Sequence, residues 1–189
     1  MARSNCRFIP RLESFDERSL PSVTITESPG GLLQIIGDRQ ENSIAIVDDG
    51  TSNPGNVTVF VDGQPFPSTG VITDIVVQTL GGKDSVDYTL APGVMSESRT
   101  VVVDLGRRPD TFAAHIDGVS VQADQFLLVQ AFGGTGDDTF TVDANAVNVG
   151  LNGRLQVDLV GGRGTDVFNV NNSIPGVVDG TFLINQQQD

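Results

Sequence analysis

Short runs of alternating apolar and polar residues repeat along the chain, and turns rich in Gly, Asp and Asn separate them. In five segments an apolar run leads into a turn glycine, and an Asp or Asn then opens a second alternating run. These segments begin at Leu32, Ile75, Val101, Leu127 and Leu155. Alternation with a period of two predicts β-strands, and no long stretch has helical periodicity. The pattern therefore predicts an all-β fold built from a repeated unit.

The acidic residue of each turn gives the length of the repeat. These residues are Asp84, Asp110, Asp138 and Asp166, so their positions differ by 26, 28 and 28. Two positions after each acid stands a large apolar residue: Val86, Phe112, Phe140 and Phe168. Because strand side chains alternate between faces, a constant phase predicts equivalent inward positions stacked coil upon coil. We therefore expect the three phenylalanines to be buried and stacked in adjacent coils.

Alignment on the turn glycines gives two further columns of apolar residues. Four positions before the glycine stand Val77, Val102, Val129 and Val157. Directly before it stand Leu80, Leu105, Phe132 and Val160. The constant phase predicts that these side chains also point inward.

A coil of about 28 residues is longer than two strands and their turns require at about 3.3 Å per residue, so a third strand fits. Candidates are Val57–Val61, Val119–Val121 and Val147–Val149. Residues 23–189 therefore resemble a parallel β-helix, a β-solenoid. The alternative is an antiparallel β-sandwich, which the hairpin-like Val61-Asp-Gly63 and Ile116-Asp-Gly118 would suit.

The first repeat is longer than the others. Asn42 and Asp84 are one and a half repeat lengths apart, which implies an insertion. The insertion contains two segments with the composition of loops, 51–56 and 63–70.

Charge narrows the range of partners. The 189-residue chain has a formal net charge of −13, and residues 23–189 carry 21 acidic against 7 basic side chains. Such a domain repels nucleic acid and anionic membranes at long range and attracts cations. No apolar run approaches the length needed to span a bilayer. We therefore expect neither a nucleic-acid partner nor a membrane span.

Residues for catalysis are sparse. Cys6 and His115 are each the only residue of their type, which excludes a zinc cluster of Cys and His. A Ser–His–Asp triad would need His115, which lies in an ordinary alternating run. We therefore expect a protein that is not an enzyme.

The alternative is a carbohydrate-active β-helix, similar to polysaccharide lyases or hydrolases. Charged residues would cluster on two coils: Asp104, Arg107, Arg108 and Asp110 on one, and Asp137, Asp138, Arg163 and Asp166 on the next. The lack of Trp and the core phase of most Phe residues disfavour a sugar-binding platform.

The N-terminal segment carries a specific motif. The run Arg11-Leu-Glu-Ser-Phe-Asp-Glu-Arg-Ser-Leu-Pro-Ser22 resembles a leader found in many bacterial secreted and surface proteins, Arg-Leu-Glu-x-Leu-Glu-x-Arg-x-Leu-Pro-Ser. Phe15 and Asp16 depart mildly from that pattern. The resemblance implies export to the bacterial cell surface or the extracellular medium. We expect residues 1–22 to be a flexible targeting segment outside the core.

Two turns fit the nonapeptide Gly-Gly-x-Gly-x-Asp-x-U-x, in which U is a large apolar residue. They run from Gly133 to Thr141 and from Gly161 to Asn169. This is similar to the RTX, or hemolysin-type, calcium-binding repeat. Glycines permit positive φ, and calcium takes six to eight oxygen ligands such as those of aspartate.

The resemblance implies a calcium site made by Asp138 and Asp166, with Asp137 second, and the turn glycines Gly133, Gly134, Gly136, Gly161, Gly162 and Gly164. The turn at 81–84 is shortened, and Arg107, Arg108 and Pro109 replace small residues in the next. We therefore expect one Ca²⁺ at most. The alternative is that these turns are purely structural, with each aspartate capping its own turn amides.

These observations predict a non-catalytic, secreted or cell-surface β-solenoid with a structural or adhesive role. Its expected partners are surface polysaccharide or other surface proteins. A third interpretation is self-association, because an uncapped solenoid end is an open strand edge.

Overall fold

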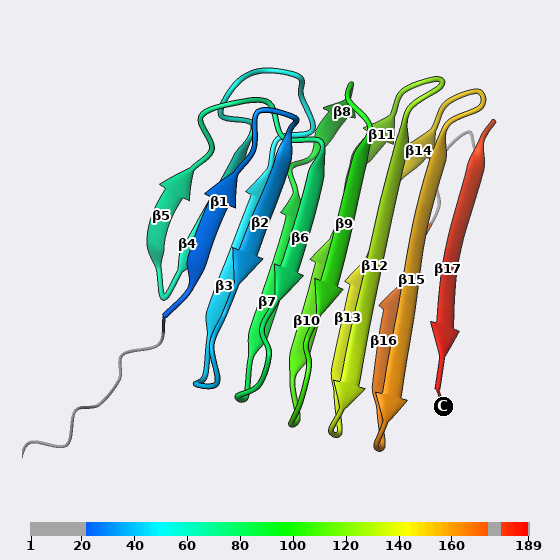
Figure 1. Cartoon of the computed structure of the whole chain (residues 1–189). Coiled ribbons are helices and arrows are strands. Elements are labelled where there is room, and N and C mark those ends of the chain that lie inside the picture. The colour runs from blue at the N-terminus through cyan, green and yellow to red at the C-terminus, as the bar shows by residue number, and fades with distance from the viewer. Residues whose placement is uncertain (1–21, 174–178, 189) are drawn as a thin grey trace, which may run out of the picture.

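The computed structural model describes residues 22–173 and 179–188, and these residues form strands and turns without a helix. Parallel strands stack into a β-solenoid of about four turns with a spacing of about 28 residues, and Figure 1 shows successive coils side by side across the picture. The predicted parallel β-helix is confirmed. Among the described residues there is no helix long and apolar enough to cross a membrane.

Three sheets make the sides of the solenoid. The first sheet contains, in order, β1 (Thr24–Glu27), β2 (Leu32–Ile36), β6 (Asp74–Gln78), β9 (Arg99–Asp104), β12 (Phe126–Thr135), β15 (Arg154–Arg163) and β17 (Thr181–Gln187). The second contains β16 (Val167–Asn171), β13 (Thr139–Asp143), β10 (Thr111–His115), β7 (Ser85–Leu90), β3 (Ser43–Asp48), β4 (Val57–Val61) and β5 (Gln64–Pro67). The short third sheet contains β14 (Asn148–Val149), β11 (Val119–Val121) and β8 (Gly93–Met95).

Alternation within each strand fills the interior with stacked aliphatic side chains. One column of the first sheet consists, in register, of Leu33, Ile75, Val101, Val129, Val157 and Ile184. All but the last are at most 2% exposed. Burial of such a side chain is worth roughly 1.5–3 kcal/mol, so columns of this kind supply much of the folding free energy.

The predicted phenylalanine column is confirmed in the second sheet. Val86, Phe112, Phe140 and Phe168 are paired residue by residue across β7, β10, β13 and β16. The rings of Phe140 and Phe168 stack with centroids 5.1 Å apart and planes 12° apart. Phe112 and Phe140 are buried, whereas Phe168 is half-buried because β16 is the edge strand of this sheet.

The two columns predicted from the turn glycines are wrong in part. Val77 pairs with Val103, and Val102 faces outward. Of the residues directly before the glycine, Leu80 and Phe132 are exposed and only Leu105 is fully buried. One reason is that Gly81 and Gly106 lie two and one positions out of register with Gly133. The other is that Phe132 and Val160 come three positions after the buried Val129 and Val157, and therefore on the opposite face of their strands.

The predicted third strand is confirmed for Val119–Val121 and, in shortened form, for 147–149. It is wrong for Val57–Val61, because β4 pairs antiparallel with β3 and extends the second sheet. The hairpin at Asp62 and Gly63 is confirmed, since both have positive φ between β4 and β5. The segment 63–70 is therefore only partly a loop.

Antiparallel pairing is confined to the N-terminal end of the solenoid. It joins β1 to β2, β3 to β4 and β4 to β5, and the other paired strands are parallel, so the alternative of a β-sandwich is wrong. Of the expected leader, residues 1–21 lie outside the described residues. Ser22 is described, and its backbone N–H donates to Asp38 Oδ2 at 2.8 Å.

Candidate functional site

The four turn acids form a ladder along the axis of the solenoid. We call Asp84, Asp110, Asp138 and Asp166 the aspartate ladder. Each Oδ1 accepts a hydrogen bond from the backbone N–H of the residue one coil earlier. The donors, from Asn42 through Asp84 and Asp110 to Asp138, lie 2.7–2.9 Å away. The aspartates therefore hold neighbouring coils together, rather than each capping only its own turn.

The second carboxylate oxygen of every rung has no partner. Oδ2 of all four ladder residues is buried without a hydrogen bond. The side chains of Asp84, Asp110 and Asp138 are at most 1% exposed, and Asp166 is 8% exposed. A buried carboxylate oxygen without a donor is strongly unfavourable when it carries charge. Protonation or a bound cation would relieve this cost.

Burial shifts the protonation equilibrium of the ladder. Desolvation raises the pKa of Asp110 to about 7, and the negative charges of Asp84 and Asp138 add to the rise, although the Asp84 amide opposes it. Desolvation also raises the pKa of Asp84 and of Asp138, again against a backbone hydrogen bond. Part of the ladder is therefore neutral below about pH 7 in the absence of a cation.

The turn glycines make room for these carboxylates. A Cβ on Gly133 would clash with Asp138 Oδ2 and with the carbonyl oxygen of Gly161. A Cβ on Gly161 would clash in the same way with Asp166 Oδ2. Gly134 and Gly162 adopt positive φ, at 85° and 88°. Gly133 and Gly161 are therefore required because other atoms approach them closely, and Gly134 and Gly162 because of their backbone conformation.

The structure brings together part of the calcium site that the RTX resemblance implies. Asp138 and Asp166 are neighbours in the ladder, at the ends of β12 and β15 where the two glycine turns stack. Asp137 is not part of it, because its Oδ1 accepts the backbone N–H of Thr165 at 2.8 Å on the exposed side of the turn.

Backbone oxygens would have to complete any metal shell. Over residues 22–173 and 179–188, no group of three or more His, Cys, Asp or Glu side chains is placed to hold a metal. The carbonyls of Thr135 and Arg163 already accept hydrogen bonds from Arg108 and Gly136. The carbonyl of Gly161 lies on the same side of Gly133 as Asp138 Oδ2. The Oδ2 atoms of Asp138 and Asp166 are therefore the oxygen ligands without a hydrogen bond that the turns offer to a hard cation.

A second buried polar group lies at the opposite end of the strands. Arg99 forms a salt bridge with Asp48, with Nε 2.6 Å from Oδ2 and Nη2 3.0 Å from Oδ1, and both side chains are fully buried. The Tyr88 hydroxyl also donates to Asp48 at 3.0 Å, and burial raises the Tyr88 pKa well above its usual value. Arg99 replaces an interior leucine, since it pairs with Leu127. That substitution within the repeat was a signal that sequence reasoning missed.

His115 lies on the outer face of the second sheet between two carboxylates. Its Nδ1 is 2.9 Å from Asp143 Oδ2, and its Nε2 is 3.6 Å from Asp87 Oδ2. Within the described part of the chain, no serine or threonine hydroxyl hydrogen-bonds to this ring. His115 therefore does not form the hydrogen bond between a nucleophile and its base that a catalytic triad needs.

The charged clusters expected for a carbohydrate-active enzyme are divided between inside and outside. Asp110 is buried in the ladder, whereas Arg107 and Arg108 are exposed on the turn. Asp138 and Arg163 are separated in the same way. Comparison with protein-family models, with curated proteins and with solved structures finds no significant match to this chain.

Proposed function

We propose that this protein is a non-catalytic module of the bacterial cell surface or extracellular medium, with a structural or adhesive role. The proposal is supported by the position of the buried charged groups, which bond to neighbouring coils inside the protein. The aspartate ladder and the Asp48–Arg99 pair both lie inside the solenoid and join coils to each other. Groups placed in this way stiffen a scaffold and are inaccessible to a substrate.

We further propose that one calcium ion binds between the turns at 133–138 and 161–166. The unpartnered Oδ2 atoms of Asp138 and Asp166 support this site, because calcium prefers charged oxygen ligands and would neutralise both. The neighbouring turn at 106–110 is unsuited, since Arg107 and Arg108 bring positive charge to it. A single ion is therefore the expected stoichiometry.

Thermal unfolding at pH 8 tests the calcium site. At 100 times its dissociation constant calcium stabilises by about 2.7 kcal/mol, which corresponds to a rise in Tm of roughly 5–10 °C for a domain of this size. Magnesium should have a much smaller effect because it dehydrates reluctantly. Asp138→Asn and Asp166→Asn should remove the rise. Asp137→Asn is the matched control, since that carboxylate lies outside the ladder.

Two results would contradict the calcium site. One is a Tm that does not change between chelator and calcium, which would leave the turns purely structural. The other is loss of the calcium effect in Asp137→Asn with retention in Asp138→Asn, which would place the ion on the exposed side of the turn.

The leader-like segment supports a location at the cell surface or in the extracellular medium, and deletion of the segment tests that location. Removing residues 1–22 from the full-length protein should abolish export, because the segment carries the export-like motif. It should change the Tm by no more than a few degrees, since β1 begins at Thr24. Normal export of the deletion variant would contradict the targeting role.

Incubation with polysaccharides tests the non-catalytic assignment. We expect no new reducing ends and no unsaturated uronate products from neutral or acidic glycans. Turnover that His115→Ala or Asp143→Asn abolishes, with the fold intact, would instead show an enzyme with its site on the outer face of the second sheet.

A further inference from the structure

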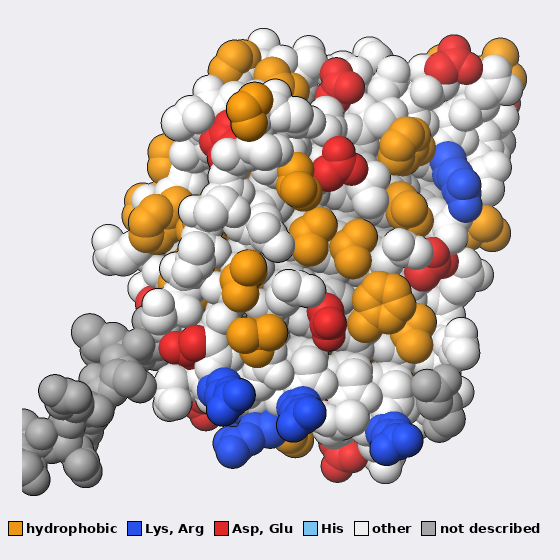
Figure 2. Space-filling model, in the orientation of Figure 1, with side chains coloured by type: hydrophobic (Ala, Val, Ile, Leu, Met, Phe, Trp, Pro, Cys, Tyr) orange, Lys and Arg blue, Asp and Glu red, His pale blue; other side chains and the backbone are white. Residues whose placement is uncertain are grey.

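Cationic side chains gather along one edge of an otherwise acidic molecule. Five of the seven basic residues of 23–189 lie at the glycine turns: Arg39, Lys83, Arg107, Arg108 and Arg163. Figure 2 shows the blue side chains along the lower edge of the molecule, below the first sheet. Of the other two, Arg99 is buried and Arg154 begins β15, at the end of the strand remote from Arg163. Net charge alone does not explain this concentration.

Three of these arginines occupy the same position in alternate coils. Thr135 pairs with Arg107 on one side and with Arg163 on the other. In the coil before Arg107 the same position is occupied by Gly81, which lies beside Arg107. One coil earlier still it is occupied by Arg39, as the pairing of β2 with β6 shows when it is continued past the strands. Neighbouring strands are 4.7–4.9 Å apart, so the arginines recur about every 10 Å. Small residues separate them.

These guanidinium groups are not neutralised by the protein. Across the described residues, none of Arg39, Arg107, Arg108 and Arg163 forms a salt bridge with a carboxylate. All four are exposed. Two carboxylates of the same turns accept backbone amides: Asp137 accepts from Thr165, and Asp38 accepts from Ser22 and Gln40. The row is therefore free to bind external anions.

Two residues that line the row adopt a backbone conformation that favours glycine. Leu80 has φ 69°, where the later coils have Gly106, Gly134 and Gly162. Arg108 has φ 85°, where the other coils have Gly82, Gly136 and Gly164. Side chains at such positions are unfavourable for folding, and residues of this kind concentrate at binding sites.

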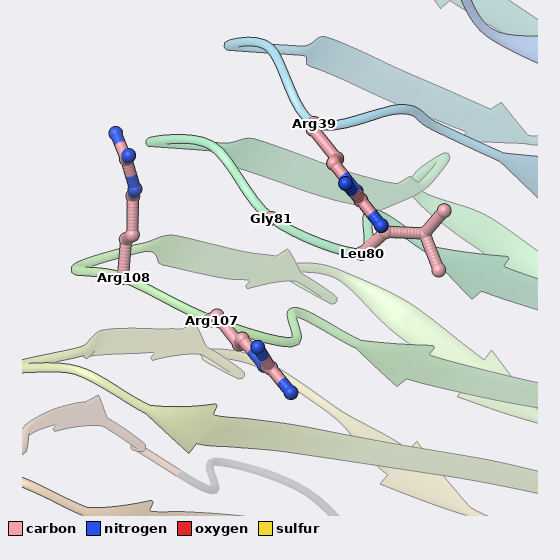
Figure 3. A pocket seen from close by; sticks show the side chains of 5 residues that line it. All are labelled: Arg39, Leu80, Gly81, Arg107 and Arg108. Carbon is pink, nitrogen blue, oxygen red and sulfur yellow. The ribbon is translucent and has the colours of Figure 1, made fainter.

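Leu80 and Arg108 lie in one open pocket of about 510 Å³, which they line together with Arg39, Gly81 and Arg107. In Figure 3 the Arg39 side chain extends past Leu80, and Arg107 extends in roughly the same direction from two coils away. Arg108 points the opposite way from the tip of its turn. The guanidinium groups thus do not converge on one point, so a ligand with several separated anionic groups fits them better than a single small anion.

We propose that this arginine row, Arg39, Arg107, Arg108 and Arg163, binds a linear acidic polysaccharide through its carboxylate or sulfate groups. Arg39, Arg107 and Arg163 form a straight, open and regularly spaced column, as binding of an extended chain requires. The residues that line the pocket include no aromatic side chain, so a nucleic-acid base has no ring there on which to stack. The site goes beyond the proposed scaffold role, and it does not involve the aspartate ladder.

Binding of the full chain to immobilised glycans tests the site. Heparin presents sulfate esters as well as carboxylates, hyaluronate presents carboxylates only, and dextran is the neutral control. Chelator is kept in the buffer, so that calcium cannot bridge protein and glycan. We expect binding to at least one acidic glycan, none to dextran, and an affinity that falls with salt. The preferred glycan shows whether sulfate or carboxylate is recognised.

Matched variants locate the binding. Arg39→Ala with Arg107→Ala should lower the affinity about tenfold, since two exposed ion pairs with the glycan are lost and each contributes a few-fold. Arg108→Gly should weaken binding with no loss of Tm, because it restores the residue of the other coils. Arg154→Ala removes one positive charge at the remote end of β15, as Arg108→Gly does at the row, and should change the affinity less than twofold.

Three outcomes would overturn the proposal. Failure of the folded wild-type protein to bind either acidic glycan is the first. An equal loss in Arg154→Ala and in the Arg39 and Arg107 double variant is the second, because it would show unspecific attraction. Tighter binding of single-stranded oligothymidylate than of both glycans, lost with the same arginines, is the third and would make the row a nucleic-acid site.

Discussion

Replacing Asp110 by asparagine should stabilise the protein at alkaline pH. Asp110 is 1% exposed, and its Oδ2 has no partner. An asparagine would keep the Oδ1 acceptor for the Asp84 amide and would put a donor near the unpartnered oxygens of the neighbouring rungs. Asn42 occupies the equivalent position of the first coil, where its buried side-chain amide hydrogen-bonds to Asp38 of the same turn.

The size of the effect follows from the pKa of Asp110. Burial raises that pKa from 3.8 to about 7. One pKa unit is equivalent to 1.36 kcal/mol, so ionisation of Asp110 removes at most about 4 kcal/mol of stability. An acid whose pKa is raised on folding favours the folded state at low pH. This contribution is present below about pH 4, is lost as pH rises toward 7, and stays lost above that.

Urea unfolding in chelator at pH 4 and at pH 8 measures the difference. We expect Asp110→Asn to be within about 1 kcal/mol of wild type at pH 4 and about 2–4 kcal/mol more stable at pH 8. A variant that is destabilised at pH 8, or that differs from wild type equally at both values, would refute the reasoning. Either result would mean that the folded protein holds this carboxylate ionised and satisfied.

Five further substitutions test the interior and the turns, each by denaturant unfolding. Phe140→Ala should destabilise the protein by about 3–5 kcal/mol, and more than Phe168→Ala, whose ring is only half-buried; equal losses would remove the stacked column. Arg99→Met should lower stability by about 3–5 kcal/mol because it leaves the buried charge of Asp48 without a positive partner, and a neutral result would show that water reaches that carboxylate. Leu80→Gly should be within about 1 kcal/mol of wild type, whereas Gly134→Ala should cost more than that, since its Cβ would clash with the Gly106 carbonyl; the reverse order would contradict the assigned register.

The coil and its aromatic column were predictable because both depend on local periodicity. The nearly constant spacing of the turn acids defines the repeat, and the fixed phase of Phe112, Phe140 and Phe168 defines an interior face. The fate of the insertion was not predictable in the same way. The Asp62-Gly63 pair predicts a hairpin, but the pairing of its first strand, β4, with β3 depends on which sheet edge is free.

The ladder chemistry was only half predictable. The repeat resemblance identifies Asp138 and Asp166, but their partners lie a full coil away in sequence, and no local pattern shows that one oxygen is bonded and the other is not. The arginine row is the opposite case. The registers of the parallel strands align Arg39, Arg107 and Arg163, but in the sequence Arg107 and Arg163 read only as departures from the small residues of an RTX-like turn.

A calorimetric titration of calcium into the protein at pH 8, after removal of metal by chelator, tests the proposed calcium site of the aspartate ladder most directly. We expect a saturable isotherm with one calcium per chain, no comparable heat with magnesium, and no binding in Asp138→Asn or Asp166→Asn. A wild-type protein that is folded and shows no calcium binding would contradict the proposed site, and the unpartnered oxygens would then be satisfied by protons alone.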